Sequence, residues 1–244
     1  SASSYLVREV VISMSVEFNM KKFTTSVLVA LSLGTAAISY PAVSASAPVA
    51  EAGPTASVDK KNPYKMIETV ADITFKRFAS EQALIRKDPN LLKNIVREEL
   101  MPYINYKYAA FKVIGNNFKK TNKKERAEFV PVFRDYLITS YAQVFTLYKN
   151  QQVTFAPAKD FSKEKVVAVN TTVTEPGRAP IDISFRVRKD KKTKEWKAYD
   201  MVAEGISLLD SKQAELSSLI RQKGLAHVTN MLREQAQKDI VFKD

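Results

Sequence analysis

The stretch "WKAYDMVAEGISLL", residues 196–209, changes character halfway along its length. Its first half alternates like a strand, in which successive side chains face opposite sides of a sheet. Glu204-Gly205 interrupts the alternation, and a short apolar segment containing Ile206 and Leu209 follows. So many apolar groups at one strand end of a charged chain indicate that they wall an apolar pocket. One face of the strand is expected to carry Trp196, Ala198, Asp200 and Val202, and the other face Lys197, Tyr199, Met201 and Ala203.

Three segments before this stretch share its period of two, which is typical of strands. They are residues 151–157, 165–175 and 180–190. The connections Glu175 to Arg178 and Lys189 to Lys194 have the composition of hairpin turns. Together with residues 195–204, these segments predict a four-stranded antiparallel meander with one apolar face.

Helical patterns flank the strands on both sides, with apolar residues recurring at steps of three and four. Pro131 lies inside the longest of these patterns and predicts a kink there. The predicted fold class is therefore α+β: N-terminal helices, a four-stranded antiparallel sheet and C-terminal helices. The start and stop signals are Asn62-Pro63, Asp88-Pro89, the capping-box pair Asn122 and Glu125, Asp210 as a cap, and Gly224 past a helix end.

The composition limits the possible chemistry. The 244 residues include no cysteine, which excludes disulfides, thiol nucleophiles and cysteine-ligated zinc. The one histidine, His227, is expected on a helix surface, so we predict no metal site and no cofactor. The formal net charge of +12 favours acidic partners such as nucleic acid, anionic lipid headgroups or an anionic membrane surface.

The N-terminal segment has the pattern of an export signal. Lys21 and Lys22 precede an apolar run from Val27 to Ile38, and small residues suited to cleavage end at Ala45. We therefore expect an upstream extension at 1–19, a signal peptide at 20–45, a flexible linker at 46–61, one domain at 62–240, and a periplasmic location. Export also makes nucleic acid an improbable partner.

No phosphate-binding glycine loop, metalloprotease motif or nucleophile elbow is present. Asp200 and Glu204 near Tyr199 could form a buried acid and a phenol donor, as in isomerases built on a cone-shaped sheet. The plainer alternative is that both carboxylates pair with cations or face water. No catalytic residue is assigned.

Four segments together closely resemble the toluene-tolerance family of exported proteins. They are residues 62–78, 91–115, 132–148 and 196–216, and "YKYAAFKVIG" and "AYDMVAEGISLL" are the most specific parts. The resemblance implies helices packed against a curved, cone-shaped, NTF2-like sheet that encloses an apolar pocket for phospholipid tails. It also implies a monomeric periplasmic shuttle that maintains outer-membrane lipid asymmetry. Its expected partners are an outer-membrane lipoprotein-porin complex and an inner-membrane ABC transporter with a periplasmic lipid-binding ring.

Physical chemistry agrees with an interior pocket. At about 0.8 kcal/mol per methylene, the roughly 30 methylenes of two chains are worth on the order of 24 kcal/mol, which no shallow groove supplies. Scattered basic residues near the apolar stripes, Arg97, Lys107 and Arg134, are expected near the headgroup. The residues expected to line the pocket are Val96, Leu100, Tyr103, Phe111, Phe133, Leu137, Tyr141, Val169, Phe185, Val187, Tyr199, Val202, Ile206 and Leu209.

Two other functions are compatible with these patterns. One is a small-molecule enzyme on the same kind of cone-shaped sheet. The other is a chaperone-like or protein-interaction module without a ligand.

Overall fold

The computed structural model describes residues 57–242 of the chain. The predicted upstream extension and signal peptide, and the predicted linker up to residue 56, lie outside the described residues. Among the described residues, no helix is both long and apolar enough to cross a membrane.

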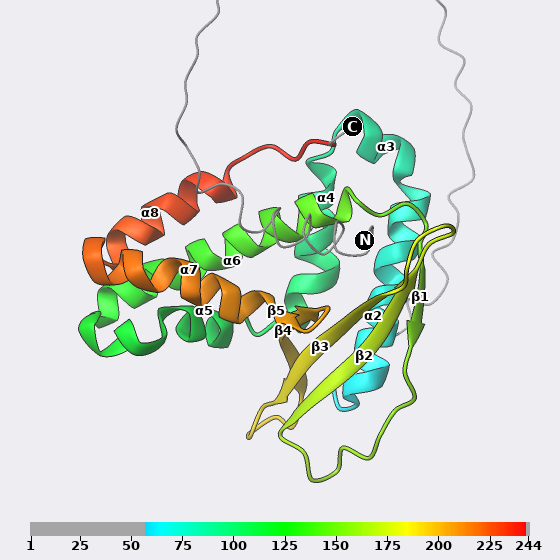
Figure 1. Ribbon diagram of the computed structural model, residues 1–244, viewed down its shortest axis with the longest axis horizontal. Helices are drawn as coiled ribbons and strands as arrows, with labels where there is room; N and C mark the ends of the chain where they lie inside the picture. Colours follow the sequence, from blue (N-terminus) through cyan, green and yellow to red (C-terminus); the bar gives the residue numbers. More distant parts are fainter. Residues whose placement is uncertain (1–56, 243–244) are drawn as a thin grey trace, which may run out of the picture. The chain divides into compact units, whose positions relative to one another are not determined.

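Helices precede and follow a single sheet, so the predicted α+β class is confirmed (Figure 1). Helix α2 runs across one face of the sheet, and α5 to α8 gather beside β4 and β5. The helical elements are α2 (Pro63–Ser80), α3 (Gln82–Lys87), α4 (Leu91–Ile95), η2 (Val96–Leu100), η3 (Met101–Tyr103), α5 (Tyr106–Ile114), η4 (Gly115–Lys120), α6 (Lys123–Phe145), α7 (Leu208–Lys223) and α8 (Leu225–Ala236).

The sheet is an antiparallel meander in the order β1-β2-β3-β4-β5. All four predicted strands are present, but the predicted number is wrong because a fifth, two-residue strand pairs with β4. The sequence signal for this strand was the Glu204-Gly205 pair. In the structure both residues have positive φ, 49° and 79°, as a two-residue hairpin turn requires. The strands are β1 (Gln152–Phe155), β2 (Val166–Thr174), β3 (Ile181–Lys189), β4 (Trp196–Ala203) and β5 (Ile206–Ser207).

Strand β4 does not keep the simple alternation expected of it. Val187 is paired with Ala198, whereas Arg186 is paired with Asp200, so Tyr199 is an extra residue opposite no partner. A bulge of this kind exchanges the faces of all residues beyond it. Asp200 therefore shares a face with Arg186 and not with Ala198, which corrects the predicted face of Asp200 and Val202.

The helix ends follow local capping chemistry. The Asn62 side chain accepts hydrogen bonds at the start of α2, and Asn122 and Glu125 form the predicted capping box of α6. Helix α7 begins earlier than expected: its cap is Ser207, whose side chain accepts a hydrogen bond from the backbone N–H of Asp210. Asp210 lies in the first helical turn, where its charge is favourable to the helix dipole.

The helix expected to start at Asp88-Pro89 and to end at Pro102 starts instead at Leu91 and changes winding twice. A short α-helix passes into the wider η2 turn, a π-helix, and then into the 3-10 turn η3, which contains Pro102. π-turns occur mostly as local interruptions of α-helices, often at functional sites. Here the segment in which the winding changes directs Leu100, Tyr103 and Ile104 towards the sheet.

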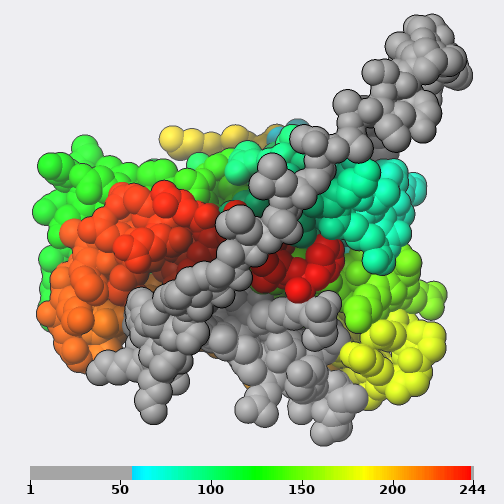
Figure 2. All heavy atoms as spheres, turned by 90° about the horizontal axis from the view of Figure 1, so that it is seen from above, coloured from blue at the N-terminus to red at the C-terminus, as the bar shows by residue number. Residues whose placement is uncertain are grey.

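The C-terminal segment after α8 is bound to the N-terminal helices. The Asn90 side chain donates to Asp239 and accepts from the backbone N–H of Ile240, and Gln143 bonds both backbone groups of Val241. Ile240 is buried. Figure 2 shows this segment in red, continuing from α8.

The apolar core is divided. One cluster joins α5, α6, α7 and α8, and a second joins α2, α3, α4 and α6. In a third, Met66 and Val70 of α2 pack on Val187 and Trp196 of the sheet. The helices therefore pack mainly on one another, and α2 covers the sheet most closely near Trp196.

Asp200 connects the sheet to α7. Its carboxylate accepts hydrogen bonds from Ser207 Oγ at 2.7 Å and from the backbone N–H of Leu209 at 3.0 Å, and it pairs with Arg186 at 3.2 Å. Burial raises the pKa of Asp200, and these three partners offset only part of that shift.

We expect Asp200 to give the stability a pH dependence of defined sign. Its pKa lies above that of an unfolded Asp, about 3.9, so the folded state binds the proton more tightly and stability falls as pH rises between the two values. Asp200→Asn removes this contribution and a charged acceptor, at a cost of about 1–3 kcal/mol. In urea denaturation, the difference between wild type and Asp200→Asn should therefore shrink as pH rises through that interval. A difference that grows with pH would mean that the folded pKa is lower than the ordinary value.

Candidate functional site

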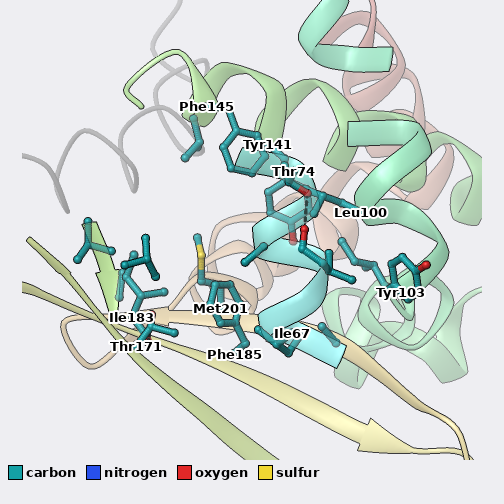
Figure 3. Close-up of a pocket in the computed structure, with 18 of the residues that line it drawn as sticks. Ile67, Thr74, Leu100, Tyr103, Tyr141, Phe145, Thr171, Ile183, Phe185 and Met201 are labelled. Carbon is teal, nitrogen blue, oxygen red and sulfur yellow. Dashed lines mark hydrogen bonds between the residues drawn. The ribbon is translucent and has the colours of Figure 1, made fainter. Parts of the chain in front are cut away.

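A cavity of about 230 Å³ lies between the helices and the inner face of the sheet. Helix α2, the end of η2 with η3, and the last turns of α6 form one side, and strands β1 to β4 form the other (Figure 3). Its wall is almost entirely apolar. The side chains labelled in the close-up are Ile67, Thr74, Leu100, Tyr103, Tyr141, Phe145, Thr171, Ile183, Phe185 and Met201.

The cavity follows from the divided core. Where α2 packs on Val187 and Trp196, helix and sheet are in contact. Towards the other end of the sheet, buried Ile181 and Ala203 form a small separate cluster with Val173 and Ile183 and no helix residue. Small residues in the walls, among them Ala71 of α2 and Ala198 of β4, leave this space unfilled.

The two threonines of the wall are already paired within the protein. Thr74 Oγ1 donates to the backbone carbonyl of Val70 at 2.7 Å, and Thr171 Oγ1 donates to that of Ile183 at 2.9 Å. These hydroxyls therefore present little unsatisfied polarity, and the wall behaves as an apolar surface.

The structure brings five of the predicted pocket residues to this cavity: Leu100, Tyr103, Tyr141, Phe185 and Tyr199. The larger part of the wall was not predicted. It comes from the α2 stripe that contains Ile67, Ala71 and Phe75, and from the inner faces of β1 and β3. Both stripes were visible in the sequence as apolar periodicities, but periodicity does not tell a tightly packed face from a cavity wall.

The other predicted pocket residues lie elsewhere. Phe133, Leu137 and Leu209 border a second cavity of about 30 Å³, next to Tyr141 and Tyr199. Val96, Val169 and Val187 are core residues within the clusters described above. Phe111 packs on the helical cluster, Val202 shares the outer sheet face with Asp200, and Ile206 is 45% exposed at the sheet edge.

The three basic residues expected near a headgroup are not part of the cavity wall. Arg97 borders a separate open cleft of about 420 Å³ between η2, α6 and α8, together with Lys93 and Arg233. Lys107 is exposed on α5, and Arg134 pairs with Asp135 at 3.4 Å. Because they are dispersed, these residues form no common anion site.

The carboxylates considered for an enzyme do not form an acid pair. Both oxygens of Asp200 are occupied by the contacts described above. Glu204 is exposed in the hairpin turn, where its Oε1 accepts from the backbone N–H of Asp182 at 2.6 Å. Within residues 57–242, no group of three or more His, Cys, Asp or Glu could hold a metal ion. His227 lies exposed on α8.

Comparison with known proteins identifies the family. The family model described as MlaC protein matches residues 68–234. The chain belongs to the MlaC family. A Haemophilus influenzae protein named intermembrane phospholipid transport system binding protein MlaC is 31% identical over 187 residues, which are 76% of this chain and 87% of the relative. The family resemblance seen in the sequence is thereby confirmed.

The fold is also found in a solved structure. A phospholipid-binding protein from Ralstonia solanacearum, in complex with a phospholipid, matches with a TM-score of 0.63 at 20% identity. The match covers 72% of this chain and 97% of that chain. This MlaC-family chain and the Ralstonia protein therefore share the arrangement of helices and sheet.

We expect the cavity to bind apolar molecules, and filling it to prevent this. Ala71→Trp would place an indole in the space between α2 and the sheet and should weaken binding of the fluorescent probe N-phenyl-1-naphthylamine by about tenfold or more, or about 1.4 kcal/mol. Ala168→Trp, on the exposed opposite face of β2, is the matched control and should bind the probe like wild type. Equal binding by all three proteins would place the probe outside this cavity.

Proposed function

We propose that this MlaC-family protein carries phospholipid between membranes, with its acyl chains inside the cavity and its headgroup outside. The observation that carries the proposal is the almost entirely apolar cavity between the helices and the sheet. A phospholipid can cross water only if its chains remain out of contact with it, at about 0.8 kcal/mol for each methylene. The names of the Haemophilus and Ralstonia proteins support the same ligand class.

The phosphate belongs outside the cavity because burying it without a partner costs several kcal/mol. The described wall contains no cationic side chain, so it has no counter-charge for a phosphate. Affinity would then come mainly from the chains, and discrimination among headgroups would be weak. The basic surface would serve chiefly to attract anionic membranes or acidic partners, an effect that salt weakens.

The proposed setting is the periplasm, with lipid exchanged between an outer-membrane lipoprotein-porin complex and an inner-membrane ABC transporter with its lipid-binding ring. Maintenance of outer-membrane lipid asymmetry would be the result. The signal-like pattern from Met20 to Ala47 supports export, and the name of the Haemophilus protein supports transport between membranes.

Export is tested at the N-terminus. Protein recovered from the periplasmic fraction should begin near Ser46, because small residues end at Ala45 and the alternative cut after Ala47 would leave Pro48 first. N-terminal sequencing that finds residues 27–38 retained would contradict cleavage.

Lipid carriage is tested by introducing a charge on one face of one strand. Ile183→Glu would put a carboxylate in the cavity wall, where it is costly to desolvate, and should reduce phospholipid per mole of purified protein by about tenfold or more. Ser184→Glu, its neighbour on the opposite face of β3, is the control and should retain the lipid. Mass spectrometry of organic extracts supplies the measurement, and circular dichroism checks that both variants fold.

A wild-type protein that contains no phospholipid and accepts none from vesicles would overturn the proposed function. Equal lipid content in Ile183→Glu and wild type would place the lipid outside this cavity.

A further inference from the structure

One end of the sheet is strongly basic. Residues 59–61, 159–165 and 188–197 meet there, and they contain eleven basic and five acidic residues, a net charge of +6. The β3–β4 hairpin and the β1–β2 connection project at this end, the lower one in Figure 1. Eight exposed lysines of these segments define a surface that we call the lysine end: Lys61, Lys159, Lys163, Lys165, Lys191, Lys192, Lys194 and Lys197.

The three segments of the lysine end are joined by backbone hydrogen bonds and ring contacts. The backbone N–H of Lys189 donates to the carbonyl of Lys165 at 2.9 Å, and that of Trp196 donates to the carbonyl of Lys60 at 2.8 Å. The ring of Phe161, in the β1–β2 connection, lies 6.1 Å from the ring of Trp196. Segments that are far apart in the sequence therefore present their lysines on one surface.

The positive charge of this surface is not neutralised within the protein. Arg188 on β3 is directly opposite Lys197 on β4, and like charges in this position on a sheet repel each other. Among the described residues, none of the eleven basic side chains is in an ion pair. Asp160 and Asp190 instead accept hydrogen bonds from backbone N–H groups of their turns, which lower the pKa of both carboxyls. The lysines are therefore available to an anionic partner.

The type of cation indicates the kind of partner. Surfaces that bind other proteins are enriched in arginine and depleted in lysine, because a guanidinium forms paired hydrogen bonds with a carboxylate whereas an ammonium is a hydrated point charge. Arg188 is the one arginine of the three segments, and its guanidinium lies over the ring of Tyr108 at 4.4 Å. A cluster of solvated lysines suits a surface of many mobile anions, and such clusters are typical of proteins that bind anionic lipid headgroups.

The lysine end is separate from the main cavity. It adjoins the contact of α2 with Val187 and Trp196, where helix and sheet are packed together, and none of its eight lysines is in the cavity wall. Strand β3 has nine residues and spans about 30 Å from this end to Ile181 in the cavity wall. This is several times the Debye length of about 8 Å at physiological ionic strength. A membrane held at the lysine end would therefore leave the Ile181 end of the sheet free.

We propose that the lysine end binds the anionic headgroups of a bilayer and holds the protein on the membrane surface by charge. This surface rests on the proposed function, because a carrier between membranes has to reach them, but the contact itself needs no lipid in the cavity. It orients the bound protein, with the end of the sheet opposite Ile181 on the membrane. Binding of this kind is reversible and weakens with salt, which suits a shuttle.

The test compares two variants whose net charge is lowered by the same amount. Lys191→Glu with Lys192→Glu changes the lysine end, and Lys119→Glu with Lys120→Glu changes two exposed lysines of η4. Binding is measured by cosedimentation with vesicles of phosphatidylcholine that contain about 30% phosphatidylglycerol or none. Wild type should bind only the anionic vesicles, and less at high salt. The lysine-end variant should bind them about tenfold or more weakly than the η4 variant, which is about 1.4 kcal/mol.

An introduced thiol gives an independent readout of orientation, because the chain has no cysteine. A fluorophore is attached at Ser162→Cys, in the β1–β2 connection, or at Ala179→Cys, in the β2–β3 hairpin at the other end of the sheet; both positions are exposed. Anionic vesicles with a nitroxide quencher on their headgroups should quench the label at residue 162 and leave the label at residue 179 unchanged.

Each outcome supports or overturns the proposal. Equal weakening by both charge variants would overturn it, since only the net charge would then matter, and so would quenching at residue 179 without quenching at residue 162. A wild type that binds no anionic vesicle would overturn it in favour of an acidic protein partner. The lysine-end variant should contain as much phospholipid as wild type by mass spectrometry. The carrier function itself fails only if wild type contains no phospholipid and accepts none.

Discussion

The carboxylate of Asp200 is the contact on which the arrangement around the cavity depends. It belongs to β4, yet it accepts hydrogen bonds from Ser207 Oγ at the end of β5 and from the backbone N–H of Leu209 in the first turn of α7. It thereby fixes where the sheet ends and where the C-terminal helices begin. The Arg186 side chain on β3 is the counter-charge that makes a buried carboxylate tolerable at this position. The pairing of β5 with β4 brings the chain to this point, and the Asp200 contacts hold the first turn of α7 there.

A second constraint is the way the core is divided. The C-terminal helices bury their apolar faces against one another, and α2 closes on the sheet only near Trp196. The inner face of the sheet between those two contacts has no helix pressed against it. A protein interior normally packs to high density, so an apolar space of this size means lost dispersion contacts in the empty protein. A ligand that fills it restores those contacts, which is the physical reason such a space suits an apolar cargo.

The same chemistry bears on how a carrier releases its cargo. Moving an acyl chain from a bilayer into an apolar cavity exchanges one apolar surrounding for another, so the large free energy of exposing the chain to water never has to be supplied at once. A wall with many strong polar contacts would hold the lipid too firmly for exchange.

The sequence by itself determined the class of the fold, the four long strands, some of the helix ends and the family. These depend on local chemistry: a period of two or of 3.6, side chains that cap a helix, and turn residues that accept positive φ. Which face of the sheet each β4 side chain takes after Ala198 could not be predicted from the sequence, because the bulge at Tyr199 is stabilised by contacts with residues far along the chain. The backbone N–H of Asn105 donates to the carbonyl of Ala198 at 2.7 Å, and Asp200 is bound by the start of α7.

The residues around the cavity show the same limit. Leu100, Tyr103, Tyr141, Phe185 and Tyr199 were recognisable as apolar or aromatic residues on plausible faces, and so were Val187 and Phe133. An apolar stripe indicates only that one face of a helix or strand is shielded from water. Whether that face meets another side chain or an empty space depends on the distance between α2 and the sheet, and only the tertiary structure decides that distance.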